Sequence, residues 1–85
     1  MIFGTSKAIK EFVKSRDEAL IDFVMNDDLT KFYEHSKKYA LDIPEREDIM
    51  KAGLYKAAQV CTNIPDEVKA TAFDKCIALG FSPFM

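Results

Sequence analysis

The sequence predicts an all-α fold, a compact bundle of about four helices with short loops, formed as a single domain by residues 1–85. Apolar residues recur at three- and four-residue spacing in four segments, which is the period of an amphipathic helix. No stretch shows the alternating pattern of a half-buried strand, and the links between segments are two to five residues long. Eighty-five residues suffice for one modest core.

The first segment predicts a helix from about Ser6 to Met25. Thr5 or Ser6 can accept hydrogen bonds from the free amides of its first turn. The short polar side chains at 26–28 compete for the backbone and end it there. Its apolar stripe comprises Ile9, Phe12, Val13, Leu20, Phe23 and Val24.

Arg16 falls where this stripe requires an apolar side chain. In one interpretation, Ser15 and Glu18 form an S-x-x-E capping box that starts a new helix and leaves Arg16 in a solvated first turn. In the other, the helix is continuous, and Arg16 lays its stem along apolar surface and pairs its guanidinium with a carboxylate. We favour the continuous helix, because the stripe stays in phase on both sides. Arg16 is then a candidate buried anchor.

The second segment predicts a helix capped by Asp27 or Asp28. His35, the only histidine, lies beside its apolar stripe, so we expect this side chain to be partly exposed. The residues on the expected buried face are Leu29, Phe32, Tyr33, Ser36 and Ala40, with Tyr39 at its margin.

The third segment predicts a helix from Pro44 to about Cys61 or Thr62, because proline suits a first helical turn and acidic residues follow it. Gly53 and Ala57, four residues apart, permit a close helix approach. The expected buried stripe comprises Ile49, Met50, Gly53, Leu54, Ala57, Val60 and Cys61.

The fourth segment predicts a helix from Pro65 or Asp66 to about Leu79, with Gly80 as its left-handed stop. The stretches "DIPE" and "NIPD" show the same helix opening used twice. The expected buried residues of this helix are Val68, Ala72, Phe73, Cys76, Ile77 and Leu79.

Composition argues against several classes of partner. Twelve Lys and Arg against fourteen Asp and Glu give a net charge of −2, and the two signs are interspersed, whereas nucleic-acid-binding proteins gather basic residues on one face. The first seven residues lack the pattern of a signal peptide, and no apolar run reaches the roughly 20 residues of a membrane span. We therefore expect a cytoplasmic protein, in which Cys61 and Cys76 are free buried thiols.

The sequence predicts no catalytic, metal or cofactor site. One histidine and two cysteines fifteen residues apart do not make a zinc pattern, and the acidic residues lack calcium-loop spacing. There is no glycine-rich phosphate loop and no nucleophile elbow. We therefore expect a protein that is not an enzyme and needs no cofactor.

A candidate interaction surface lies around Tyr55, which we expect on the polar side of the third helix. The aromatic chain ends, which include Phe3, either fold back over the bundle or form an exposed apolar patch. The candidate surface comprises Tyr55, Lys51, Lys56 and Gln59, together with Phe81, Phe84 and Met85 near the C-terminus.

The stretch "IPEREDIMKAGLYKAA", residues 43–58, resembles segments of small uncharacterised proteins from phages and other mobile elements of Gram-positive bacteria. It covers under a quarter of the chain, and its motif is mostly helix punctuation. The resemblance implies an intracellular accessory protein and carries over no functional residue.

The leading hypothesis is a cytoplasmic helical protein that acts by protein contact, as a homodimer or docked on a partner. A nucleic-acid-binding transcriptional regulator is an alternative, although the third helix offers only Lys51, Lys56 and Gln59 around Tyr55 for reading DNA. A small inhibitor of host machinery is a further alternative, which would differ from the first only in its target.

Overall fold

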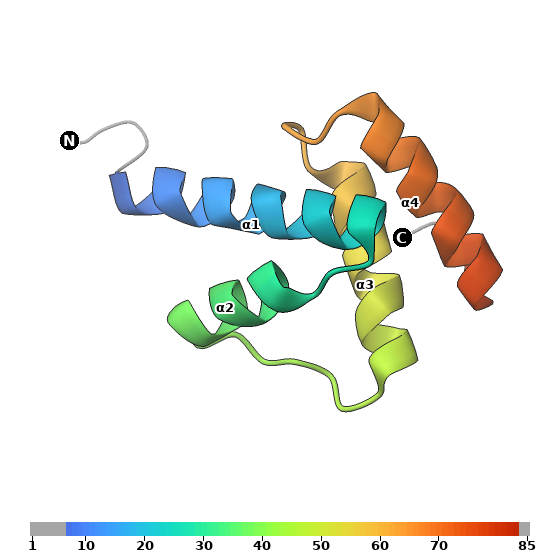
Figure 1. Cartoon of the computed structure of the whole chain (residues 1–85), viewed down its shortest axis with the longest axis horizontal. Helices are drawn as coiled ribbons and strands as arrows, with labels where there is room; N and C mark the ends of the chain where they lie inside the picture. Colours follow the sequence, from blue (N-terminus) through green and yellow to red (C-terminus); the bar gives the residue numbers. More distant parts are fainter. Residues whose placement is uncertain (1–6, 84–85) are drawn as a thin grey trace.

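The computed structural model describes residues 7–83, which form four helices joined by three links (Figure 1). The helices are α1 (Lys7–Asn26), α2 (Thr30–Lys38), α3 (Glu47–Val60) and α4 (Asp66–Leu79). No strand occurs within residues 7–83. The predicted all-α bundle of about four helices is confirmed.

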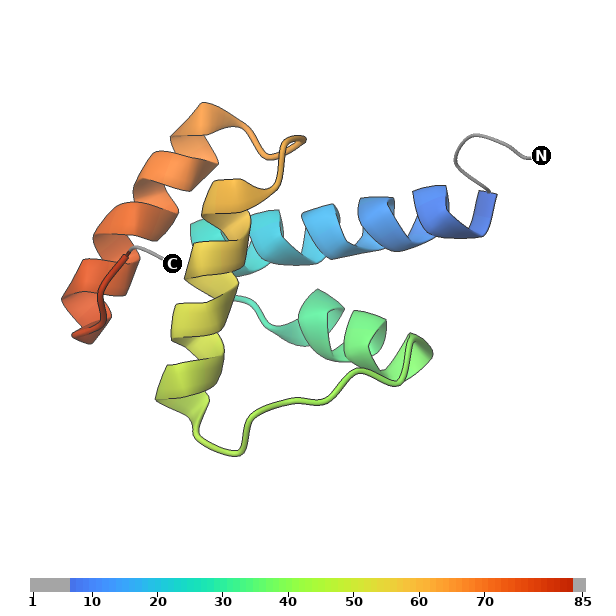
Figure 2. The ribbon, with the colours of Figure 1, turned by 180° about the vertical axis from the view of Figure 1, so that it is seen from behind.

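The helices are arranged so that part of α1 extends beyond the others. In Figures 1 and 2, α2 lies beside α1, while α3 crosses the C-terminal half of α1 and α4 lies on the far side of α3. With 20 residues, α1 is about 30 Å long, whereas the 14 residues of α3 and of α4 span about 21 Å. The molecule measures 45 × 27 × 22 Å. The first half of α1 therefore projects past α3 and α4 and has only α2 alongside it.

The core lies where the second half of α1 meets α3 and α4. Phe23 of α1 stacks on Tyr55 of α3, with the ring centroids 4.9 Å apart and the planes inclined by 25°. Small residues surround this pair and let the helix backbones come close. The buried cluster comprises Leu20, Phe23, Val24, Ala52, Tyr55, Ala58, Ile64, Val68, Ala72 and Cys76.

The first helix is continuous through Ser15, so the prediction of a single helix is confirmed. Its C-terminal end is tied to α4 by Lys75, whose Nζ donates to the Val24 carbonyl and lies 3.2 Å from a carboxylate oxygen of Asp27. A cation at this end also complements the helix dipole. Lys75 therefore fixes α4 against the end of α1.

The predicted buried face of α3 is wrong in part, because the helix is rotated about its axis. Tyr55, expected on the surface, is 6% exposed, whereas Ile49 is 41% exposed. A Cβ atom at Gly53 would meet nothing within 4 Å, so no close helix approach uses this glycine. The buried residues of α3 are Met50, Ala52, Tyr55 and Ala58, with Leu54, Ala57 and Cys61 partly buried against the core and Val60 exposed.

Two further predictions for α2 and α3 need correction. Ser36 is buried in α2 as expected, but Tyr33 and Ala40, expected on the same buried face, are exposed. The link from α2 to α3, residues 39–46, is longer than expected, because α3 begins at Glu47 and not at Pro44. Because of its length, this link places little restraint on the position of α2 relative to α3.

The end of α4 follows the prediction. Gly80 has a φ of 97°, in the left-handed region that a residue without Cβ adopts easily, and Val68, Ala72 and Cys76 are buried as expected. Ile77, expected in the core, is exposed. Phe81 packs partly buried against the core, which supports the folded-back interpretation for this residue.

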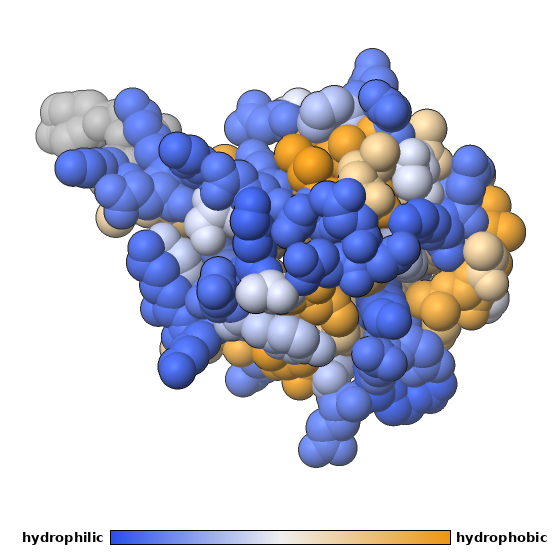
Figure 3. Space-filling view, in the orientation of Figure 1, coloured by the Kyte–Doolittle hydropathy of each residue, from blue (hydrophilic) through white to orange (hydrophobic). Residues whose placement is uncertain are grey.

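Figure 3 shows that hydrophilic residues cover most of α1 and α2 on the face turned to the viewer. Hydrophobic residues appear there in separate patches, mainly over the part of the molecule that contains α3 and α4.

Candidate functional site

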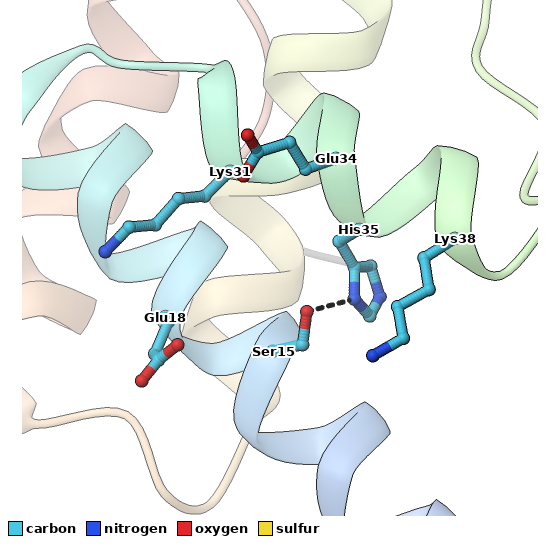
Figure 4. Close-up of a pocket in the computed structure, with 6 residues that line it drawn as sticks. All are labelled: Ser15, Glu18, Lys31, Glu34, His35 and Lys38. Carbon is cyan, nitrogen blue, oxygen red and sulfur yellow. Dashed lines mark hydrogen bonds between the residues drawn. The ribbon is translucent and has the colours of Figure 1, made fainter.

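A polar pocket of about 260 Å³ lies between α1 and α2 (Figure 4). Ser15 and Glu18 line it from α1, and the remaining residues come from α2. The residues from α2 are Lys31, Glu34, His35 and Lys38. Figure 4 shows the hydrogen bond from the His35 ring crossing the pocket to Ser15.

His35 is at the centre of the interface between the two helices. Its Nδ1 and the Ser15 Oγ share a hydrogen bond of 2.8 Å. Its ring lies 4.8 Å from that of Phe12 and 4.9 Å from that of Tyr39, centroid to centroid. Only 4% of His35 is exposed, so the predicted partial exposure is wrong. These four residues, Phe12, Ser15, His35 and Tyr39, are called the His35 contact below.

The charges near His35 favour its neutral form. Burial lowers the pKa of His35 below its usual 6.5, and Arg16 and Lys38 lower it further by repulsion. A histidine that activates a serine must become positively charged during the reaction, and a neighbouring carboxylate normally stabilises that charge. Two cations beside the ring oppose it. The Ser15–His35 pair is therefore a poor candidate for a nucleophile and its base.

The continuous first helix places Arg16 next to a carboxylate, as predicted. Nε and Nη2 of Arg16 donate to Oδ1 of Asp17 at 3.1 and 2.9 Å. Asp17 is buried, but the Arg16 side chain is 34% exposed. Arg16 is thus a partner of Asp17 as expected, but it is half-buried and not the buried anchor that the sequence predicted.

A second depression, the α1 groove, runs along α1 from Ile9 in its projecting half to Ile21 in its second half, and has a volume of about 560 Å³. Three apolar side chains, Ile9, Val13 and Ile21, line it, and Ile9 is 54% exposed. Asn63, from the link between α3 and α4, closes one end. Its charged lining residues are Lys10, Lys14, Asp17 and Glu18.

The charges of the α1 groove are separated along the helix. Lys10 and Lys14, both exposed, form a basic block toward the N-terminus. The acidic block, one turn later, comprises the exposed Glu18 and the buried Asp17, whose carboxylate is paired with Arg16. The groove therefore combines apolar side chains with charge of opposite sign at its two ends.

The interaction surface expected around Tyr55 lacks its central residue. Tyr55 lies in the core, and burial raises the pKa of its hydroxyl above the usual 10. Lys51 lies 3.8 Å from the Glu47 carboxylate, and Gln59 donates to the Tyr55 carbonyl at 3.3 Å. Lys56 is only partly exposed. Lys51, Lys56 and Gln59 are therefore not accompanied by an exposed aromatic side chain at position 55.

Two residues of the predicted C-terminal patch, Phe84 and Met85, lie outside the described residues, as does Phe3. Both cysteines are free thiols, as expected: Cys76 is buried and donates from Sγ to the Ser82 carbonyl at 3.5 Å, while Cys61 is partly buried. Within residues 7–83, no group of three or more His, Cys, Asp or Glu side chains could hold a metal ion.

Comparisons with protein-family models, curated proteins and solved structures gave no match. The resemblance of residues 43–58 to phage proteins therefore stays a prediction. In the part of the chain that the structure describes, no helix has the length and apolar character needed to cross a bilayer.

Sequence reasoning missed the α1 groove, although it singled out two of its apolar residues. Ile9 and Val13 belong to the apolar stripe that was assigned to the core. The pattern could not indicate that α3 and α4 cover only the second half of this helix. The excess length of the first segment over the third and fourth was the only available signal.

Proposed function

We propose that this chain acts in the cytoplasm by protein contact, without catalysing a reaction, and that it pairs with a second copy of itself along the α1 groove. The observation that carries the proposal is the charge pattern of the groove, with a basic block and an acidic block beside one apolar stripe. The two free thiols support a reducing compartment. The cations beside His35 support the absence of catalysis.

The charge pattern is self-complementary when two α1 helices run antiparallel. A two-fold axis then places the basic block of each copy near the acidic block of the other, so each favourable contact occurs twice. The apolar side chains at 9, 13 and 21 line the same groove as the two blocks and are covered by the same contact. A parallel pair would instead set like charges against each other.

The expected dimer is weak. Residues 9–21 span only about 20 Å of helix, which is short for a stable interface. We therefore expect a dissociation constant of about micromolar or higher. A dimer of this strength exchanges with the monomer as concentration changes.

Sedimentation equilibrium over a range of protein concentrations tests the proposal. The substitution Lys14→Glu turns two attractive contacts into repulsive ones, which at roughly 1–2 kcal/mol in total weakens the dimer about 5- to 30-fold. The double variant Lys14→Glu/Glu18→Lys exchanges the charges and should restore much of the affinity. Lys37→Glu, an exposed lysine on α2, is the matched control and should leave the mass unchanged.

Two results would contradict the proposal. A native chain that stays monomeric at millimolar concentration excludes self-association. A dimer that responds equally to Lys14→Glu and Lys37→Glu, with no recovery in the double variant, pairs through another surface. Far-ultraviolet circular dichroism of each variant checks that the helices are intact.

A further inference from the structure

Helix α2 is attached to the rest of the molecule through α1 alone. Among the described helices, α2 comes close only to α1, and its nine residues include just two that are buried, His35 and Ser36. A helix this short is marginal in water when isolated, because nucleation is costly. The helical state of α2 therefore depends on its contact with α1.

The His35 contact supplies the specific part of this attachment. Phe12 and Tyr39 cover the ring, with a mutual centroid distance of 4.7 Å, and Ser15 holds Nδ1. The Ser36 hydroxyl is also buried but has no hydrogen-bond partner. Such a hydroxyl weakens the interface slightly, because its desolvation is not compensated. His35 is thus the one buried side chain of α2 with a polar bond to α1.

Charged groups from both helices surround the ring. Arg16 from α1 and Lys38 from α2 repel a positive charge there, while Glu18 and Glu34 line the exposed side of the same pocket. Lys31 lines the pocket and Tyr39 covers the ring. The last-turn position of His35 favours a positive charge through the helix dipole. Burial and the two cations act in the opposite direction and lower the pKa of His35.

We propose that the His35 contact is a proton-sensitive attachment, and that α2 is released from α1 when His35 gains a proton. A buried imidazolium has lost its water shell and faces Arg16 and Lys38, whereas released α2 exposes the ring to solvent. The eight-residue link after α2 allows this movement without displacing α3. The proposal does not require pairing along the α1 groove and applies to the monomer.

The direction of the effect follows from the two protonation states. The pKa of His35 is lowered when α2 is attached and returns toward 6.5 when α2 is released. Released α2 therefore binds more protons, so attachment is complete above pH 6.5 and weakens as the pH falls through the lower, attached value. Each unit of difference between the two pKa values changes the ratio of attached to released α2 tenfold.

Nuclear magnetic resonance of a dilute, monomeric sample tests the proposal directly. His35 is the only histidine, so its imidazole Hε1 signal is unambiguous in a titration from pH 7.5 to 5. We expect a midpoint below 6.5, and a parallel loss of amide protection in α2 while the amides of α4 stay protected. Protection factors corrected for intrinsic exchange give the size of the release.

Variants separate the histidine from other groups that titrate. His35→Gln should abolish the pH dependence of α2 protection in this range. Lys38→Gln, which removes one repelling charge, should move the midpoint upward and reduce the release at pH 5, whereas the exposed neighbour change Lys37→Gln should do neither. Lys38→Gln keeps the test decisive if the His35 variant loses α2 at every pH.

Three outcomes would overturn the proposal. These are a His35 midpoint at or above 6.5, α2 protection that is constant from pH 7.5 to 5, and an unchanged pH dependence in His35→Gln. A monomer that behaves as expected supports the proposal whatever the result for dimerisation.

Discussion

Replacing Tyr55 by alanine tests the rotation of α3 directly. A buried aromatic side chain removes roughly 150–250 Å² from water, which corresponds to about 4–6 kcal/mol as an upper bound. The stacked pair with Phe23 contributes about 1 kcal/mol more, while alanine returns about 0.5 kcal/mol through its helix propensity. Measured losses for such changes fall near 3–5 kcal/mol, and we expect Tyr55→Ala to cost about 4 kcal/mol.

The expected loss is a large part of the total free energy of unfolding, so it is easily measured. A chain of 85 residues has a free energy of unfolding of about 4–13 kcal/mol. With a urea dependence near 1–1.5 kcal/mol per molar, Tyr55→Ala should lower the unfolding midpoint by roughly 3 M or leave the chain largely unfolded. Urea titration followed by circular dichroism at 222 nm is the assay.

Ile49→Ala is the matched control on the same helix. Ile49 belongs to the face that the sequence pattern assigned to the core, but it is 41% exposed. Its replacement should cost less than about 1 kcal/mol. A larger loss for Ile49→Ala than for Tyr55→Ala would refute the observed rotation and restore the predicted face.

Further predictions concern the helix ends and Arg16. Arg16→Ala should lower the free energy of unfolding by about 0.5–1 kcal/mol in urea titration, because Asp17 loses its partner. The loss is small because solvent screens a half-exposed ion pair, and an unchanged midpoint would show that the pair contributes nothing. Ala40→Gly should raise the free energy of unfolding by roughly 0.5–1 kcal/mol, because Ala40 has a φ of 52°, and a loss of stability would contradict this strain. The Thr30 amide donates to Asp28 at 2.9 Å and lowers its pKa, so Asp28→Ala should reduce α2 protection at neutral pH. That difference should narrow as the pH falls below 3.8 and through the lowered pKa of Asp28, where the native carboxylate gains a proton. A constant difference would show that the charge of Asp28 does not stabilise α2.

The number and bounds of the helices could be predicted because their signals are local. Gly80 and the polar run at 26–28 act through the backbone near them, and the predicted ends of α1 and α4 lie within one residue of the observed ends. The start of α3 was the exception. Arg46 has an extended backbone and pairs with Asp48, so the chain after Pro44 stays outside the helix.

The buried faces could not be predicted equally well. Apolar residues surround α3 on several sides, and Tyr55 is buried because Phe23 of another helix lies opposite it. His35 was expected to be partly exposed because it lies beside the apolar stripe of its helix, and nothing in its neighbours indicated Ser15 twenty residues away. Which residues are buried depends on how the helices pack against each other, and the sequence of a single helix does not determine that packing.

The thiols of Cys61 and Cys76 differ in solvent access, so their reactivity reports transient opening of the folded structure. Cys61 is within reach of a thiol reagent in the folded state, whereas Cys76 can react only after α4 lifts away from the core residues of α1 and α3. The delay between the first and the second alkylation, followed by mass spectrometry over time, therefore measures this opening. The experiment needs no added label and no substitution.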